Sequence, residues 1–111
     1  MPELRAIWSE DEQKWFYSVL DIIDAFNMQD DYEKNRNYWK CLKAKLKKEN
    51  SELVSATTQL KLKAADGKRY NTDVIDMDTV RLLAGALTDE ISIREIFMKG
   101  IDYSYYYEQE D

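Results

Sequence analysis

The sequence contains no histidine and a single cysteine, Cys41. Without histidine, the Ser-His-Asp and Cys-His arrangements that activate a nucleophile are excluded, and a zinc site lacks most of its usual ligands. One cysteine cannot form a disulfide within the chain, so a reducing compartment, the cytoplasm, is expected. With no base to activate it, we interpret Cys41 as a core thiol beside an apolar helical stripe.

Long hydrophobic runs are also missing. No stretch approaches the roughly 20 apolar residues that a membrane-spanning helix needs. The N-terminus turns acidic at once and has no apolar signal-peptide core. We therefore expect a soluble protein with no membrane partner. A chain of 111 residues, 44% of them hydrophobic, indicates one globular domain.

The charge is unevenly distributed along a chain whose net charge is −6. Residues 34–69 carry eleven basic and three acidic side chains, a balance of +8, which leaves −14 on the remainder. Such segregation allows one positive face on an acidic body. A solvated, lysine-rich helix explains the same composition. The charge alone leaves both alternatives open.

The first elements predicted are a β-hairpin and a helix. Residues 3–8 and 14–18 read as two strands across a polar turn. The second strand, KWFYS, has aromatic residues on both faces, which indicates that both faces make contacts or that one is an interface. Ser18 is a good N-cap for a helix that ends at Asn27. Its apolar face comprises Val19, Ile22, Ile23 and Phe26.

Residues 31–50 predict a longer helix with two stripes. The apolar stripe comprises Tyr32, Asn35, Trp39, Leu42 and Leu46, widened by Tyr38. The basic stripe comprises Arg36, Lys40, Lys43 and Lys47. Acids at the start and lysines near the end match the helix dipole, which explains part of the pattern without a ligand. Four like charges along one edge nevertheless indicate an anionic partner.

A second hairpin follows. Residues 51–58 predict either a loop or a short strand. Residues 59–63, QLKLK, alternate with period 2, the leucines facing inward and the lysines outward. An Asp66-Gly67 turn then leads to a returning strand over residues 69–73. The basic side chains of this hairpin are Lys61, Lys63, Lys68 and Arg69.

Asp76 or Asp78 can cap a further helix that Thr88 and Asp89 end. Its apolar residues are Val80, Leu82, Leu83 and Leu87, and we expect Gly85 and Ala86 to allow close packing. A short helix, capped by Ser92 and ended by Gly100, completes the pattern.

These elements predict an α+β fold, a small single domain in which short antiparallel β-hairpins pack against three to four helices. We expect residues 1–100 to form the domain and residues 101–111 to form an acidic, tyrosine-rich tail.

An enzyme is the class that the sequence favours least. Asp73, Asp76 and Asp78 in DVIDMD allow a metal cluster, but their spacing does not match a calcium-binding loop. Helix capping explains these acids more simply. We expect no catalytic residue, no metal and no cofactor.

Three stretches, in their order and spacing, resemble the N-terminal domain of the BRO family. They are WFYSVLDIIDAF, YWKCLKAKL and QLKLKAADGKRYNTDVIDMDTVRLL, and the resemblance covers roughly residues 8–87. The family comprises baculovirus repeated-ORF and prophage-antirepressor proteins, including a DNA-damage-inducible D-like branch. The resemblance implies a small α+β domain that binds DNA, without a cofactor or enzymatic activity. After Leu87 the chain departs from the family pattern.

The leading hypothesis is therefore a DNA-binding regulatory domain. Phosphate contacts would come from the helix stripe, Arg36, Lys40, Lys43 and Lys47, and from the hairpin, Lys61, Lys63, Lys68 and Arg69. Tyr38 or Asn37 would reach a base edge or stack on a base. This hypothesis requires the two basic sets to share one face.

The alternative hypothesis is a protein-interaction module that engages a repressor or another protein, as antirepressors in the wider group do. Tyrosine is a residue type that interfaces favour. The candidate contact residues are Tyr103, Tyr105, Tyr106 and Tyr107, which lie in the acidic tail. The oligomeric state stays open on both hypotheses.

Overall fold

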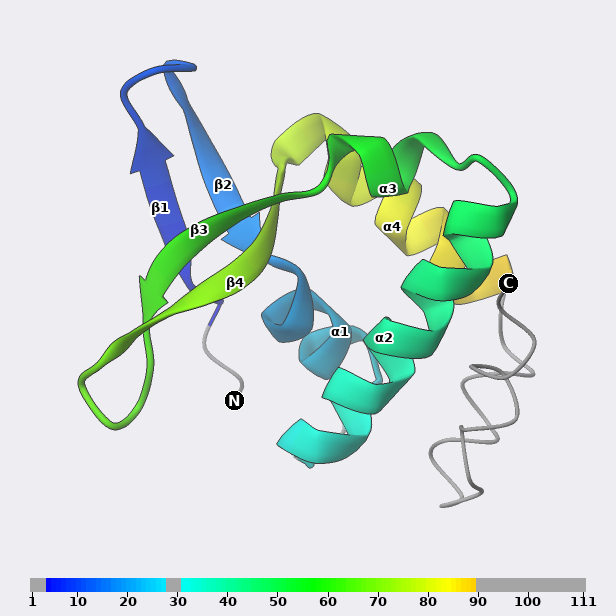
Figure 1. Cartoon of the computed structure of the whole chain (residues 1–111), viewed down its shortest axis with the longest axis horizontal. Coiled ribbons are helices and arrows are strands. Elements are labelled where there is room, and N and C mark those ends of the chain that lie inside the picture. Colours follow the sequence, from blue (N-terminus) through cyan, green and yellow to red (C-terminus); the bar gives the residue numbers. More distant parts are fainter. Residues whose placement is uncertain (1–3, 28–30, 90–111) are drawn as a thin grey trace.

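The computed structural model describes residues 4–27 and 31–89, in which strands and helices alternate in mixed order. The elements are β1 (Ala6–Ser9), β2 (Lys14–Ser18), α1 (Val19–Asn27), α2 (Tyr32–Lys48), α3 (Glu52–Ala56), β3 (Thr58–Lys63), β4 (Arg69–Asp76) and α4 (Met77–Asp89). The strands form one antiparallel sheet against which helices pack, as Figure 1 shows. The predicted α+β fold is confirmed. Within the described ranges, no helix has both the length and the apolar character needed to cross a membrane.

The sheet has the strand order β1-β2-β4-β3, so two hairpins meet at a short central β2–β4 pairing, with Phe16 opposite Asp76 at one end. Beyond this pairing the hairpins diverge (Figure 1). The sheet also curls, so that the Arg5 guanidinium, next to β1, donates a hydrogen bond of 3.1 Å to the Lys63 carbonyl at the end of β3. The same guanidinium forms an ion pair with Asp21 of α1 at 2.8 Å. Arg5 thus connects both edges of the sheet to a helix.

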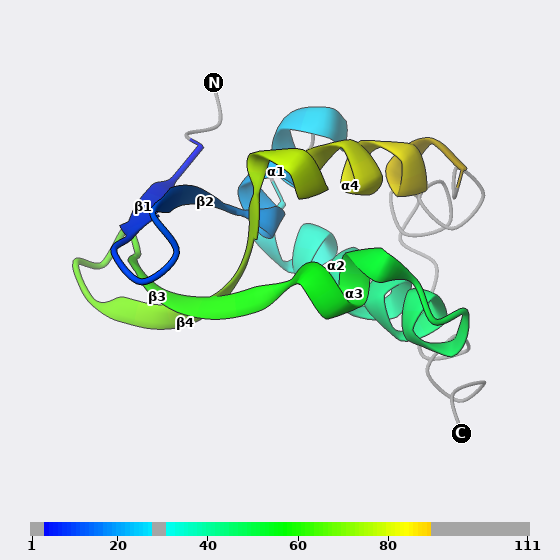
Figure 2. The same cartoon turned by 90° about the horizontal axis from the view of Figure 1, so that it is seen from above.

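Two hydrophobic cores lie on the two sides of the sheet. The inner side of the curl holds a small core made of Phe16, Leu62 and Val74, with Ile7 and Leu60 against it. The main core is larger, and in it the helices pack against Ile75 of β4. Its buried side chains include Val19 and Ile23 of α1, Tyr38, Trp39 and Leu42 of α2, Leu53 of α3, and Leu83 and Leu87 of α4. Figure 2 shows α2 and α3 on the same side of the molecule as the β3–β4 hairpin, with α1 and α4 on the other side.

The helices begin where a short polar side chain accepts a hydrogen bond from an early backbone N–H, which satisfies a donor that the helix itself leaves without a partner. The acceptors are Ser18 for α1 (3.3 Å), Asp31 for α2 (3.0 Å), Ser51 for α3 (3.2 Å) and Asp76 for α4 (2.9 Å). The predicted Ser18 cap is confirmed. Of the two acids considered for α4, Asp76 is the cap.

The stretch after α2 differs from the prediction. Residues 51–58 contain the short helix α3 rather than only a loop or a strand, because Ser51 caps it and Leu53 is anchored in the main core at 1% exposure. Strand β4 also continues to Asp76 instead of ending at residue 73, since Val74 and Ile75 are both fully buried. Five residues are too few for a periodic apolar pattern, which is why α3 escapes sequence analysis.

Smaller differences concern single elements. Strand β1 spans Ala6–Ser9 rather than residues 3–8. Tyr32, which we assigned to the apolar stripe of α2, is 65% exposed because it lies in the first turn, beyond the core. The remaining stripe residues are buried, and Cys41 is confirmed as a core thiol at 1% exposure. The helix predicted after Ser92 and the tail of residues 101–111 lie outside the described residues.

Two glycines have opposite structural roles. The prediction that Gly85 allows close packing in α4 is wrong, because a Cβ there would have no neighbour within 4 Å. Gly67, in the β3–β4 turn, has a φ of +86° that side chains of L-residues disfavour. We expect Gly85→Ala to raise the free energy of unfolding by about 0.5–1 kcal/mol, by removing backbone freedom from the unfolded chain. We expect Gly67→Ala to lower it by about 1 kcal/mol. Urea denaturation of both variants checks this, and destabilisation by Gly85→Ala would contradict the assigned packing.

Candidate nucleic-acid interface

The carboxylate of Asp73, on β4, connects three elements. It accepts hydrogen bonds from Trp39 Nε1 at 2.7 Å, Lys43 Nζ at 2.8 Å and Gln59 Nε2 at 3.0 Å. Its side chain is 11% exposed, and the Lys43 ammonium also lies 5.8 Å from the centre of the Trp39 ring. Burial alone would raise the pKa of Asp73, but the hydrogen bonds from Lys43, Trp39 and Gln59 outweigh burial and lower it. We call Asp73 and its three donors, Trp39, Lys43 and Gln59, the carboxylate cluster. It holds α2 against the β3–β4 hairpin.

The pairing register places three hairpin cations on the side of the ribbon that α2 contacts. Side chains of a strand alternate between its two faces, and directly paired residues share a face. Asp73 pairs with Gln59, and the next pairs on the same face are Asn71 with Lys61 and Arg69 with Lys63. The three cations are exposed. Lys61, Lys63 and Arg69 therefore continue the surface that begins at Asp73.

The basic stripe of α2 borders this surface. Arg36, Lys40, Lys43 and Lys47 lie along one edge of the helix, within 60° of one another at about 100° per residue. Lys43 bonds to β4, so this edge adjoins the hairpin, and Arg36, Lys40 and Lys47 are exposed along it. Figure 2 agrees, with α2 and the hairpin on one side of the molecule. The helix set and the hairpin set are brought to one side; we call this surface the basic face.

Two predicted contact residues occupy different positions from the rest. Lys43 already bonds to Asp73, so within the basic face it also positions α2. Lys68 lies in the turn, where its backbone N–H donates to Asp66 at 2.8 Å and its side chain is exposed. Its position is at the end of the ribbon, beyond the last pair of the register.

The residues expected to reach bases differ in their exposure. Tyr38 is fully buried in the main core, as its place beside the apolar stripe of α2 indicated, so the prediction that it stacks on a base is wrong. Asn37, beside it, is half-buried. Asn71 is exposed between the hairpin cations, and no sequence signal singled it out. The four tail tyrosines, Tyr103, Tyr105, Tyr106 and Tyr107, lie outside the described residues.

Two of the three acids of DVIDMD have protein partners in the structure. Asp73 belongs to the carboxylate cluster, and Asp76 accepts from Lys14 at 2.8 Å and from Thr79. The hydrogen bonds from Lys14 and Thr79 lower the pKa of Asp76 to about 2. Across residues 4–27 and 31–89, no three potential ligands are grouped so as to hold a metal ion.

Comparison with known proteins adds no relative to this description. The chain matches no family model, no curated protein and no solved structure.

Proposed function

We propose that this domain binds nucleic acid, and specifically duplex DNA, as a non-catalytic regulatory domain of the BRO or prophage-antirepressor type. The observation that carries the proposal is the bond of Lys43 to Asp73 together with the β3–β4 register. These bring the helix cations and the hairpin cations to one face. A cationic surface of this kind binds the phosphate backbone and releases counterions.

The charge distribution supports an oriented encounter with DNA. Residues 34–69, which include most of α2 and most of the hairpin, carry +8, and the remainder carries −14. An acidic body turned away from a polyanion and a basic face turned toward it give the molecule a preferred orientation. The elements that present the cations, an α-helix and a two-stranded ribbon, are those that the DNA major groove admits. Within this proposal, phosphate contacts hold the domain and Asn71 lies near enough to the cations to reach a base edge.

Arg69 and Arg81 offer a matched pair for the test. Both are exposed arginines, but Arg69 belongs to the basic face and Arg81 to α4 on the other side of the molecule (Figure 2). We expect Arg69→Gln to weaken binding to duplex DNA and to reduce the slope of log affinity against log salt by about one. We expect Arg81→Gln to leave both unchanged. Fluorescence anisotropy at several salt concentrations measures both quantities.

The same titrations separate the competing outcomes. Equal losses for the two variants would mean that binding follows net charge rather than the basic face. No binding to duplex or single-stranded DNA at low salt would refute the proposal. Tighter binding to the single strand would redirect it to single-stranded nucleic acid.

A further inference from the structure

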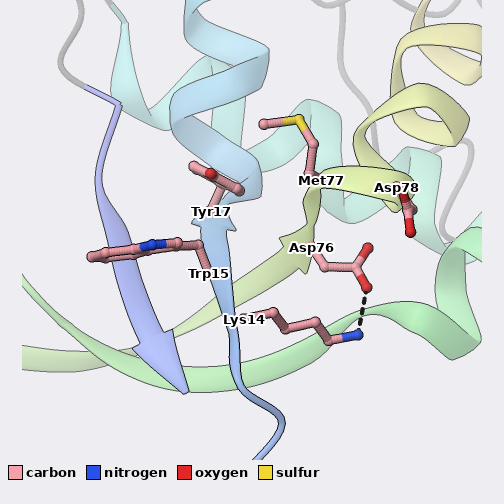
Figure 3. A pocket seen from close by; sticks show the side chains of 6 residues that line it. All are labelled: Lys14, Trp15, Tyr17, Asp76, Met77 and Asp78. Carbon is pink, nitrogen blue, oxygen red and sulfur yellow. Dashed lines mark hydrogen bonds and ion pairs between the residues drawn. The ribbon is translucent and has the colours of Figure 1, made fainter. Parts of the chain in front are cut away.

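A hollow of ≈ 270 Å³ opens where β2 extends past the end of β4. Because β4 ends at Asp76 opposite Phe16, the preceding residues of β2, Lys14 and Trp15, adjoin the start of α4 on that side. The lining side chains are Lys14, Trp15, Tyr17, Asp76, Met77 and Asp78 (Figure 3). The hollow thus lies between the β1–β2 hairpin and the first turn of α4.

Large apolar side chains around this hollow are exposed. Trp15 is 51% exposed and Met77 59%. Trp8, paired with Trp15 across the hairpin, is 39% exposed and meets it edge-to-face, with 5.6 Å between ring centroids. This contact stabilises the hairpin but leaves indole surface uncovered. A contiguous exposed apolar patch marks an interaction site, and tryptophan is prominent among residues that contribute binding energy.

Negative charge lies beside these side chains, in the turn between Trp8 and Trp15 and at the start of α4. The Lys14 ammonium is balanced by Asp76 at 2.8 Å. The exposed acids nearby are Glu10, Asp11 and Glu12 in the β1–β2 turn and Asp78 on α4. A phosphate backbone is repelled by such a rim, whereas a cationic side chain is attracted to it. These acids therefore favour a positively charged partner, whereas the basic face favours a negatively charged one.

We propose that an acid-rimmed tryptophan patch, formed by Trp8, Trp15, Tyr17 and Met77, binds an arginine-containing segment of a partner protein. A guanidinium is planar and weakly hydrated, and it stacks on an indole face more favourably than an ammonium does. The guanidinium lies on Trp15, the carboxylates of the rim balance its charge, and a neighbouring apolar side chain of the partner packs on Met77. The domain then has two faces of opposite charge, one for a nucleic acid and one for a protein.

Tryptophan resonances locate such binding directly. Of the three tryptophans in the chain, Trp8 and Trp15 belong to the patch and Trp39 is a buried control at 4% exposure. The ¹⁵N-labelled chain of residues 1–111 is titrated with a capped peptide in which arginine alternates with leucine. We expect the indole N–H signals of Trp8 and Trp15 to shift and that of Trp39 to stay in place. The same peptide with glutamate in place of arginine should shift none of them.

Met77→Ala and Leu82→Ala provide matched variants. Both remove an exposed apolar side chain from α4, 59% and 41% exposed, but only Met77 lines the hollow. We expect Met77→Ala to weaken peptide binding at least about threefold and Leu82→Ala to leave it unchanged. Asp78→Asn should weaken binding and reduce its salt dependence, because one rim charge is lost.

Three results would overturn the proposal. The first is the absence of indole shifts with about 5 mM arginine peptide, a concentration that reveals even weak sites. The second is equal binding of the glutamate peptide. The third is a set of shifts that follows protein concentration without peptide, which would assign the patch to contact with a second copy of this chain.

Discussion

Asp73→Ala is expected to lower the free energy of unfolding by about 3 kcal/mol. The substitution removes the acceptor for three hydrogen bonds and leaves the Trp39 indole N–H, on a residue only 4% exposed, without its partner. It also removes the countercharge of Lys43. Because small domains are stable by only about 5–15 kcal/mol, the loss is large. Chemical denaturation followed by tryptophan fluorescence measures it.

Asp66→Ala is the control. Asp66 also accepts two hydrogen bonds, from the Lys68 N–H at 2.8 Å and the Tyr70 hydroxyl at 2.6 Å, but it lies exposed in the hairpin turn. Water replaces these partners, so we expect a much smaller loss than for Asp73→Ala. Equal losses for Asp66→Ala and Asp73→Ala would show that the carboxylate cluster does not hold α2 against the hairpin.

The pH dependence gives a second readout. The folded protein holds the pKa of Asp73 below its ordinary value of 3.8, so the unfolded chain takes up a proton first as the pH falls. The stabilisation from this carboxylate is therefore complete above that value and is lost as the pH drops through the lower, folded pKa. Asp76, with a pKa of about 2, adds to the loss over the same window. The stability difference between the wild type and Asp73→Ala should shrink as the pH falls below about 4.

The local elements followed from short-range patterns. The alternation of residues 59–63 and the Asp66-Gly67 pair identify the β3–β4 hairpin, and Gly67 has the positive φ that such a turn requires. The apolar spacing likewise identifies α1, α2 and α4. These signals lie within a few residues of one another, so a single sequence contains them.

The site depended on contacts that no local pattern encodes. Asp73 lies 34 residues from Trp39 and 30 from Lys43 in sequence. Lys43 and Lys47 look alike in the basic stripe, yet only the first reaches β4. That two basic sets exist is a property of the sequence. That they share a face is a property of the pairing register and of one carboxylate.

Exposure along α4 is another property that the sequence left open. Leu82 and Leu83 are neighbours in the same predicted helix, and both counted as apolar residues of it. The structure separates them, with Leu83 fully buried in the main core and Leu82 41% exposed. Adjacent positions on a helix point about 100° apart, so only one of them can face the core fully.

We therefore expect Leu83→Ala to lower the free energy of unfolding by about 3 kcal/mol, since the loss combines burial with the cavity left behind. Leu82→Ala, the same substitution one residue earlier, should cost less than about 1 kcal/mol. Urea denaturation of both variants measures the difference, and similar losses would show that α4 packs with a different face. If Leu83→Ala unfolds the domain, adding saturating duplex DNA should restore folding, because a ligand that binds only the folded state raises stability by mass action. The pair thus tests the placement of α4, and DNA rescue would connect that fold to the proposed function.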